Sequence, residues 1–146
     1  LFRSLRLRQI GDEIKISRAY GYFNPKTTSP LVGITAGCGL GPIWSIMSQT
    51  GGRLFYSHKS PEYTVFDEEL AGSLIQVDHF STQHLVDEVG GWRNGRFKVS
   101  EIVTKAPDDA HFLVCGALDF VRDVWAKLVD GGVDQQKIST ETFFES

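Results

Sequence analysis

The chain has 146 residues, 41% of them hydrophobic and 23% charged, which is enough for one domain with a substantial buried core. Its net charge of −3 argues against a nucleic-acid partner, and no apolar run approaches the length of a membrane span. The two cysteines, Cys38 and Cys115, lack the spacing of a zinc site. We therefore expect a protein of the reducing cytoplasm that contains no disulfide.

The first 28 residues do not resemble the start of an α/β domain. Apolar and charged residues alternate in 5–8 and again in 14–16, with Gly11-Asp12 between them. This pattern predicts a hairpin of two short strands. Because two strands cannot bury an apolar face alone, we interpret the segment as the end of an earlier β domain, followed by a Pro- and Thr-rich linker.

Segment 29–47 predicts a buried strand, a glycine turn and a helix. The strand is the apolar run 31–34, the turn contains Gly37, Gly39 and Gly41, and Pro42 suits the first helical position. The N–H groups at such a helix start can bind a phosphate. The glycine spacing differs from G-x-G-x-x-G, and no acidic residue follows about twenty positions later. The turn could therefore serve only to pack the strand against the helix.

Strands alternate with helices in the remainder of the chain. Apolar runs predict strands at 53–57, 74–80, 111–114 and 137–141. Helical spacing predicts helices at 66–71, 100–104 and 117–129, and the polar segment 81–98 is expected to be a long surface loop. The pattern predicts an α/β fold with right-handed crossovers, a parallel sheet of about five strands, helices on both faces and a short β tail in front.

Unusual residues follow several predicted strands, at the edge of the sheet where ligands gather in such folds. They are Gly37-Cys38-Gly39, Ser57-His58-Lys59, Cys115-Gly116 and Phe143-Phe144. Taken singly, Cys115 could be a buried core thiol, and the two phenylalanines could belong to the core or to a frayed terminus. The four histidines, His58, His79, His84 and His111, have no metal-ligand spacing, so we expect no metal site.

Three stretches carry a resemblance to a known family: AGCGLGP, LFYSHKSPEYTVFDEELAG and HFLVCGALDFVRDVWAKLVDGGVDQQKISTETF. In order and spacing they resemble the nucleotide-binding domain of the ferredoxin–NADP reductase family, with flavohaemoglobin and oxygenase-reductase modules the most similar. GDEIKISRAYGYF resembles the end of that family's flavin-binding barrel. The resemblance implies an NAD(P)-binding domain at 29–146, preceded at 1–28 by the last part of the barrel and a linker.

The resemblance implies transfer of a hydride from NAD(P)H to FAD or FMN, and then of electrons to a haem, iron–sulfur or other acceptor protein or domain. It places Cys115, Phe143 and Phe144 in the catalytic centre, beside the nicotinamide and the flavin. The implied coenzyme-binding residues are Thr35, Gly37, Cys38, Gly39, Leu40, Gly41, Pro42, Ser57, His58, Lys59, Cys115, Gly116, Ala117 and Phe120.

Two departures from the family pattern qualify the resemblance. Ala117 follows Cys115-Gly116, where proline is common in the family, and Leu40 stands where threonine or isoleucine is common. The family's flavin-binding arginine and tyrosine-serine motif lie upstream, so this chain alone is not expected to hold flavin well. An alternative interpretation is a non-catalytic nucleotide-sensing or subunit-docking module with the same fold.

Overall fold

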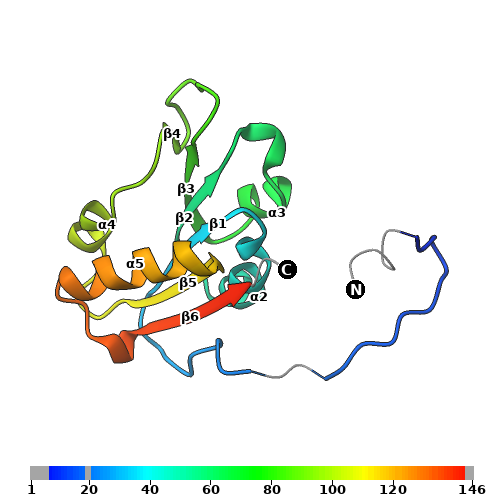
Figure 1. Cartoon of the computed structure of the whole chain (residues 1–146), viewed down its shortest axis with the longest axis horizontal. Helices are drawn as coiled ribbons and strands as arrows, with labels where there is room; N and C mark the ends of the chain where they lie inside the picture. The colour runs from blue at the N-terminus through cyan, green and yellow to red at the C-terminus, as the bar shows by residue number, and fades with distance from the viewer. Residues whose placement is uncertain (1–6, 19–20, 144–146) are drawn as a thin grey trace.

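A six-stranded parallel sheet organises the chain, in the order β4-β3-β2-β1-β5-β6 (Figure 1). The computed structural model describes residues 7–18 and 21–143. The strands are β1 (Leu31–Ala36), β2 (Gly52–His58), β3 (Ile75–Ser81), β4 (Trp92–Asn94), β5 (His111–Ala117) and β6 (Ile138–Phe143). The helices are α2 (Leu40–Thr50), α3 (Asp67–Ala71), α4 (Val99–Lys105) and α5 (Leu118–Asp130), with short 3₁₀ helices η1 (Gly37–Gly39), η2 (Pro61–Tyr63) and η3 (Gln135–Lys137).

Helices cover both faces of the sheet, so the predicted α/β class is confirmed. One hydrophobic cluster joins the sheet to α2 and α3, and a second joins it to α4 and α5 (Figure 1). The residues of β1 alternate between the two clusters, Leu31 in the first and Val32 in the second. Burial on both faces explains why this strand reads as a continuous apolar run.

The start of α2 differs from the prediction in detail. The 3₁₀ turn η1 follows β1, and α2 then begins at Leu40, so Pro42 is the third residue of the helix rather than the first. Pro42 still lies in the first turn, where backbone N–H groups have no intrahelical acceptor and a missing N–H costs nothing.

Strand β4 lies within the segment predicted as a loop, and it raises the number of strands from about five to six. It has three residues and pairs with the outer edge of β3, with Trp92 opposite His79. Two backbone bonds flank it, from the N–H of His79 to Gly91 (2.8 Å) and from the N–H of Gly95 to Ser81 (2.8 Å). A strand this short carries no usable periodicity, which explains why the sequence pattern missed it.

The strands predicted in the amino-terminal segment are not formed within residues 7–18, all of which are exposed. The turn between them is formed, because the N–H of Asp12 donates to the carbonyl of Gln9 (3.1 Å) and Gly11 has a φ of 102°. Figure 1 shows this segment extending away from the sheet. Its apolar side chains Leu7, Ile10, Ile14 and Ile16 are exposed, and an isolated pair of strands that buries no apolar face is only marginally stable.

Within residues 7–18 and 21–143, no helix combines the length and the hydropathy that a membrane crossing requires.

Candidate functional site

The direction of strand addition reverses between β1 and β5. From β1 the chain adds β2, β3 and β4 on one side, and it then returns to add β5 and β6 on the other. The two strands pair in register, with Thr35 opposite Cys115 near their carboxyl ends. In open α/β sheets, ligands bind outside the carboxyl ends of the strands at such a reversal.

A cleft of about 560 Å³ lies at this end of the sheet. The predicted site residues that line it are Gly37, Cys38, Ser57, His58, Lys59, Ala117 and Phe120. The Thr82 backbone N–H and hydroxyl both donate to the carbonyl of His58 (3.0 Å each), which fixes the end of β3 against the end of β2. The structure therefore brings residues that follow three separate strands to one cleft.

The glycine turn is packed tightly against the sheet. A Cβ at Gly39 would collide with the carbonyl oxygen of Cys115 and lie 2.5 Å from the Thr35 hydroxyl oxygen. That hydroxyl donates to the same carbonyl (2.9 Å), so three backbone segments meet where Gly39 approaches β5. By contrast, a Cβ at Gly37 or Gly41 would meet no atom within 4 Å. The missing side chain at Gly39 thus serves internal packing, as the alternative interpretation of the turn expected.

Several predicted site residues are buried beneath the cleft and do not line it. Thr35, Leu40 and Cys115 are fully buried, and the Leu40 and Cys115 side chains belong to the hydrophobic cluster beneath α2. Burial raises the pKa of the Cys115 thiol to about 12, with a further contribution from the negative charge of Glu141. The thiol is therefore protonated at neutral pH and cannot serve there as a nucleophile or a base.

Of the remaining predicted residues, those that the structure describes do not line the cleft. A Cβ at Gly116 would lie 2.8 Å from the Phe120 ring, so this glycine lets the ring pack over the end of β5. Gly41 and Pro42 lie on α2 and are absent from the lining. Phe143, at the end of β6, is 37% exposed and is also absent from the lining. Phe144 lies outside the described residues.

Tyr63, Thr82 and Arg96 also line the cleft, and sequence reasoning missed them. Thr82 directly follows β3, so the rule that located Ser57 and His58 could have found it. Arg96 comes from the segment after β4, and without that strand nothing in the sequence placed the segment beside the cleft. Among the described residues, the cleft lining contains two cationic side chains, Lys59 and Arg96, and no carboxylate.

A buried polar cluster supports the cleft from below. His58 Nδ1 donates to the carbonyl of Ser60 (3.0 Å), and the His79 ring stacks on Trp92 with centroids 4.6 Å apart. Burial lowers the pKa of both imidazoles, and the proximity of His58 lowers that of His79 further. Both rings are therefore neutral at pH 7. Across the described residues, no three His, Cys, Asp or Glu side chains are arranged to hold a metal ion.

Comparison with known proteins supports the resemblance. No family model matches the chain. The flavohemoprotein of Rhizobium meliloti (strain 1021) is 29% identical over 152 residues, covering 92% of this chain and 38% of that protein. The FAD/NAD-binding domain of nitric oxide dioxygenase from Vibrio cholerae O1 biovar El Tor superposes with a TM-score of 0.72 at 24% identity, covering 87% of this chain and 56% of that one.

The flavohemoglobin of Malassezia yamatoensis, solved with FAD and heme, superposes with a TM-score of 0.67 at 27% identity, covering 79% of this chain and 32% of that one. The chain thus spans about a third to a half of the length of these proteins. The predicted resemblance to the NAD(P)-binding domain of ferredoxin–NADP reductase-like proteins, in its flavohaemoglobin form, is confirmed.

Proposed function

We propose that residues 29–146 are the NAD(P)H-binding half of a flavin-dependent oxidoreductase, and that residues 1–28 are the end of its flavin-binding barrel with a linker. Bound NAD(P)H would supply a hydride to FAD or FMN held mainly by the upstream domain, and electrons would pass to a haem, iron–sulfur or other acceptor. The observation that carries the proposal is the cleft at the β1–β5 reversal, with a glycine turn on one side and two cations on another.

The lining suits the parts of a dinucleotide. The N–H groups of the turn at Gly37 and Cys38 precede α2, where the helix dipole favours a pyrophosphate. Lys59 and Arg96 add positive charge at the end of the cleft formed by β2 and the segment after β4. Ala117 and Phe120 offer a small residue and a flat ring beside β5, which suits a planar nicotinamide.

The proposed hydride transfer depends on the position of the two rings rather than on a reactive side chain of the protein. Hydride transfer requires close ring-on-ring contact and no acid–base group in the protein. The buried, protonated Cys115 thiol agrees with a site that works by shape and position. The hydrogen bond from Thr35 to the Cys115 carbonyl holds the two strand ends together and so fixes the distance from the glycine turn to Ala117.

Substitution of Cys38, which is exposed and lines the cleft, tests the proposal. Cys38→Asp would place a carboxylate where we expect the pyrophosphate, while an acidic side chain there favours the helix start and leaves the fold intact. Calorimetry should show NADPH and NADH binding at least tenfold more weakly to Cys38→Asp, and unchanged binding to Cys38→Ser. Unchanged affinity in a folded Cys38→Asp variant would remove the coenzyme from this cleft.

One observation favours the alternative of a non-catalytic nucleotide-sensing or docking module. Cys115 and Phe143, which the resemblance places beside the nicotinamide and the flavin, do not line the cleft. The flavin content of the full-length protein separates the two functions. Loss of flavin absorbance on anaerobic addition of NADPH or NADH would support the reductase, whereas a flavin-free protein that binds the coenzyme would support the module.

A further inference from the structure

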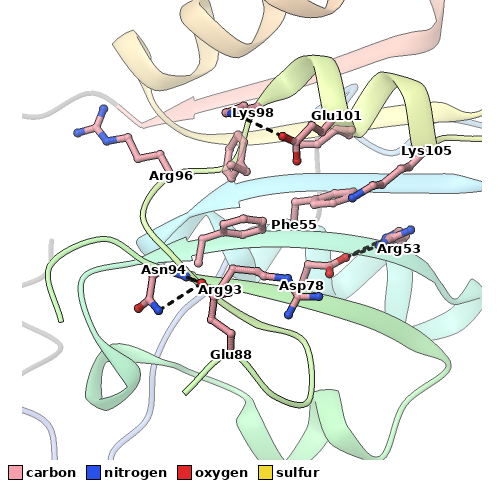
Figure 2. Close-up of a pocket in the computed structure, with 13 residues that line it drawn as sticks. Arg53, Phe55, Asp78, Glu88, Arg93, Asn94, Arg96, Lys98, Glu101 and Lys105 are labelled. Carbon is pink, nitrogen blue, oxygen red and sulfur yellow. Dashed lines mark hydrogen bonds and ion pairs between the residues drawn. The ribbon is translucent and has the colours of Figure 1, made fainter. Parts of the chain in front are cut away.

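A second hollow, of about 260 Å³, lies between α4 and the side of the sheet formed by β2, β3 and β4 (Figure 2). We call it the α4 groove. Its basic residues are Arg53, Arg93, Arg96, Lys98 and Lys105, its acidic residues are Asp78, Glu88 and Glu101, and its other lining residues are Phe55, Phe80, Asn94, Phe97 and Ile102. Cations outnumber acids here although the whole chain has a net charge of −3.

Two of the three acids of the groove form ion pairs with its cations, and the third, Glu88, is bonded in the described part of the chain only to neutral groups of Asn94. Asp78 accepts from Arg53 Nε (2.9 Å) and forms an ion pair with its Nη2 (2.8 Å), and Glu101 lies 3.6 Å from the Lys98 ammonium. Glu88 accepts from the backbone N–H of Asn94 (2.9 Å). Among the described residues, neither Arg93 nor Lys105 forms an ion pair. The groove therefore presents cationic side chains that its own acids do not neutralise.

The floor of the groove is aromatic. Phe55 is 5% exposed, and the rings of Phe80 and Phe97 meet edge to face with centroids 5.6 Å apart. Figure 2 shows Lys105 reaching from α4 toward Phe55, and Arg93 extending from β4 across the lower side of the groove. Cations above an apolar floor suit a ligand that has a flat apolar body and one negative group.

Asp78 is the most buried acid of the groove, and Arg53 pairs with its charge. It is 8% exposed, and both Arg53 nitrogens bind the same oxygen, Oδ2. This ion pair offsets the negative charge that would otherwise repel an anionic ligand. The volume of about 260 Å³ is below the roughly 300–1,000 Å³ of sites for drug-sized ligands, so the groove suits a ligand smaller than a dinucleotide.

We propose that the α4 groove binds a small aromatic carboxylate, with its ring on Phe80 and Phe97 and its carboxylate between Arg93 and Lys105. This site is separate from the coenzyme cleft, although Arg96 lines both. The attraction between the charges should weaken as salt rises, while the burial of the ring should not.

Titration of the full chain with benzoate, followed by amide chemical shifts in NMR spectra, tests the proposal. We expect saturable shifts in β2, β3 and α4. Acetate, which lacks the ring, and benzamide, which lacks the charge, should each bind at least tenfold more weakly. Shifts that do not saturate, or acetate binding as tightly as benzoate, would overturn the proposal.

Variants keep the test specific to the groove. Lys105→Gln and Arg93→Gln change exposed side chains, and each should weaken benzoate about tenfold with unchanged thermal unfolding. Arg96 is left intact because it also lines the coenzyme cleft. Lys127→Gln, an exposed change on α5 outside the groove, is the matched control and should leave the affinity unchanged. Equal benzoate affinity in all three variants would place the binding elsewhere and overturn the proposal.

Discussion

The two regions that border the cleft at the β1–β5 reversal are built in different ways. At the β1–β5 reversal, the geometry comes from backbone contacts: Gly39 packs on the Cys115 carbonyl, and Thr35 bonds to the same oxygen. Toward the sheet edge, it comes from side chains: His58 lines the cleft, its ring lies 5.7 Å from the ring of His79, and Trp92 stacks on His79. At Gly39 the first region has no space for an added atom, whereas the second depends on which of its side chains are charged.

Adding one methyl group at Gly39 should have the largest effect. In Gly39→Ala the new Cβ meets backbone atoms that cannot move aside, so we expect the free energy of unfolding to fall by about 3 kcal/mol. Gly41→Ala is the matched control, since its Cβ points into open space on α2, and we expect it to gain up to about 1 kcal/mol. Urea unfolding of both variants measures the difference. Equal stabilities would show that the turn does not depend on this close packing.

Removing the Thr35 hydroxyl should have the next largest effect. Thr35→Val leaves the buried Cys115 carbonyl without this donor, at a cost of about 1–3 kcal/mol. The control is Thr104→Val, which breaks a bond of the same kind from Thr104 to the Ser100 carbonyl (2.9 Å) on the exposed side of α4. There, water replaces the lost partner, so the loss should stay within about 0.5 kcal/mol. If both variants lose the same free energy of unfolding, then burial does not make the Thr35 hydrogen bond more important for stability than the exposed Thr104 bond.

The features that the sequence could predict are those formed by residues that are contiguous in the chain or that follow predicted strands. The strand, turn and helix from Leu31 to Thr50 are contiguous, so local apolar pattern and glycine content were enough to locate the turn. The carboxyl-end rule then brought Ser57, His58 and Lys59 to the same cleft, even though the sheet order was unknown.

The rest depends on packing between segments that are distant in the sequence. Arg96 reaches the cleft only because the three-residue strand β4 pairs with β3, and so short a strand carries no periodic signal. Whether Gly39 faces a ligand or the sheet depends on how closely η1 approaches β5, which no local pattern encodes. The depth of Cys115 beneath the cleft likewise follows from the packing of α2 over the sheet.

The buried imidazoles of the edge region predict a dependence of stability on pH. Burial depresses the folded-state pKa of His58 and His79, against opposing contributions from Asp67 to both and from Asp78 to His79. As the pH falls, these two histidines are therefore protonated in the unfolded chain before they are protonated in the folded chain. The free energy of unfolding is therefore highest above the unfolded-state pKa of about 6.5. It falls as the pH drops through the lower pKa values that His58 and His79 have in the folded chain.

His79→Phe keeps an aromatic ring against Trp92 and removes one titrating group. We expect thermal unfolding temperatures of this variant to fall less between about pH 7 and pH 5 than those of the unmodified chain. His84→Phe, an exposed change outside the buried cluster, should keep the original pH dependence. A pH profile unchanged by His79→Phe would show that this imidazole is not buried in its neutral form.

Coenzyme preference should show the smallest effect, and it depends on the two cations of the edge region. Lys59 and Arg96 line the cleft without a carboxylate, so we expect the 2′-phosphate of NADPH to be attracted rather than repelled. Both side chains are exposed, and an exposed ion pair contributes less than about 1 kcal/mol, which is under a tenfold preference. We therefore expect both coenzymes to bind, with NADPH modestly preferred at low salt and the difference narrowing as salt rises.

Calorimetric dissociation constants for both coenzymes at two salt concentrations measure this preference. Arg96→Gln should reduce the preference for NADPH, and Lys59→Glu should reverse it, because a carboxylate would then face the ribose. Lys15→Gln, in the exposed amino-terminal segment, should leave it unchanged. If the unmodified chain already prefers NADH tenfold or more, and Lys59→Glu leaves this preference unchanged, then Lys59 does not face the ribose. That outcome would leave the N–H groups of the β1–β5 region, which we propose to face the pyrophosphate that both coenzymes share, as the main source of coenzyme affinity.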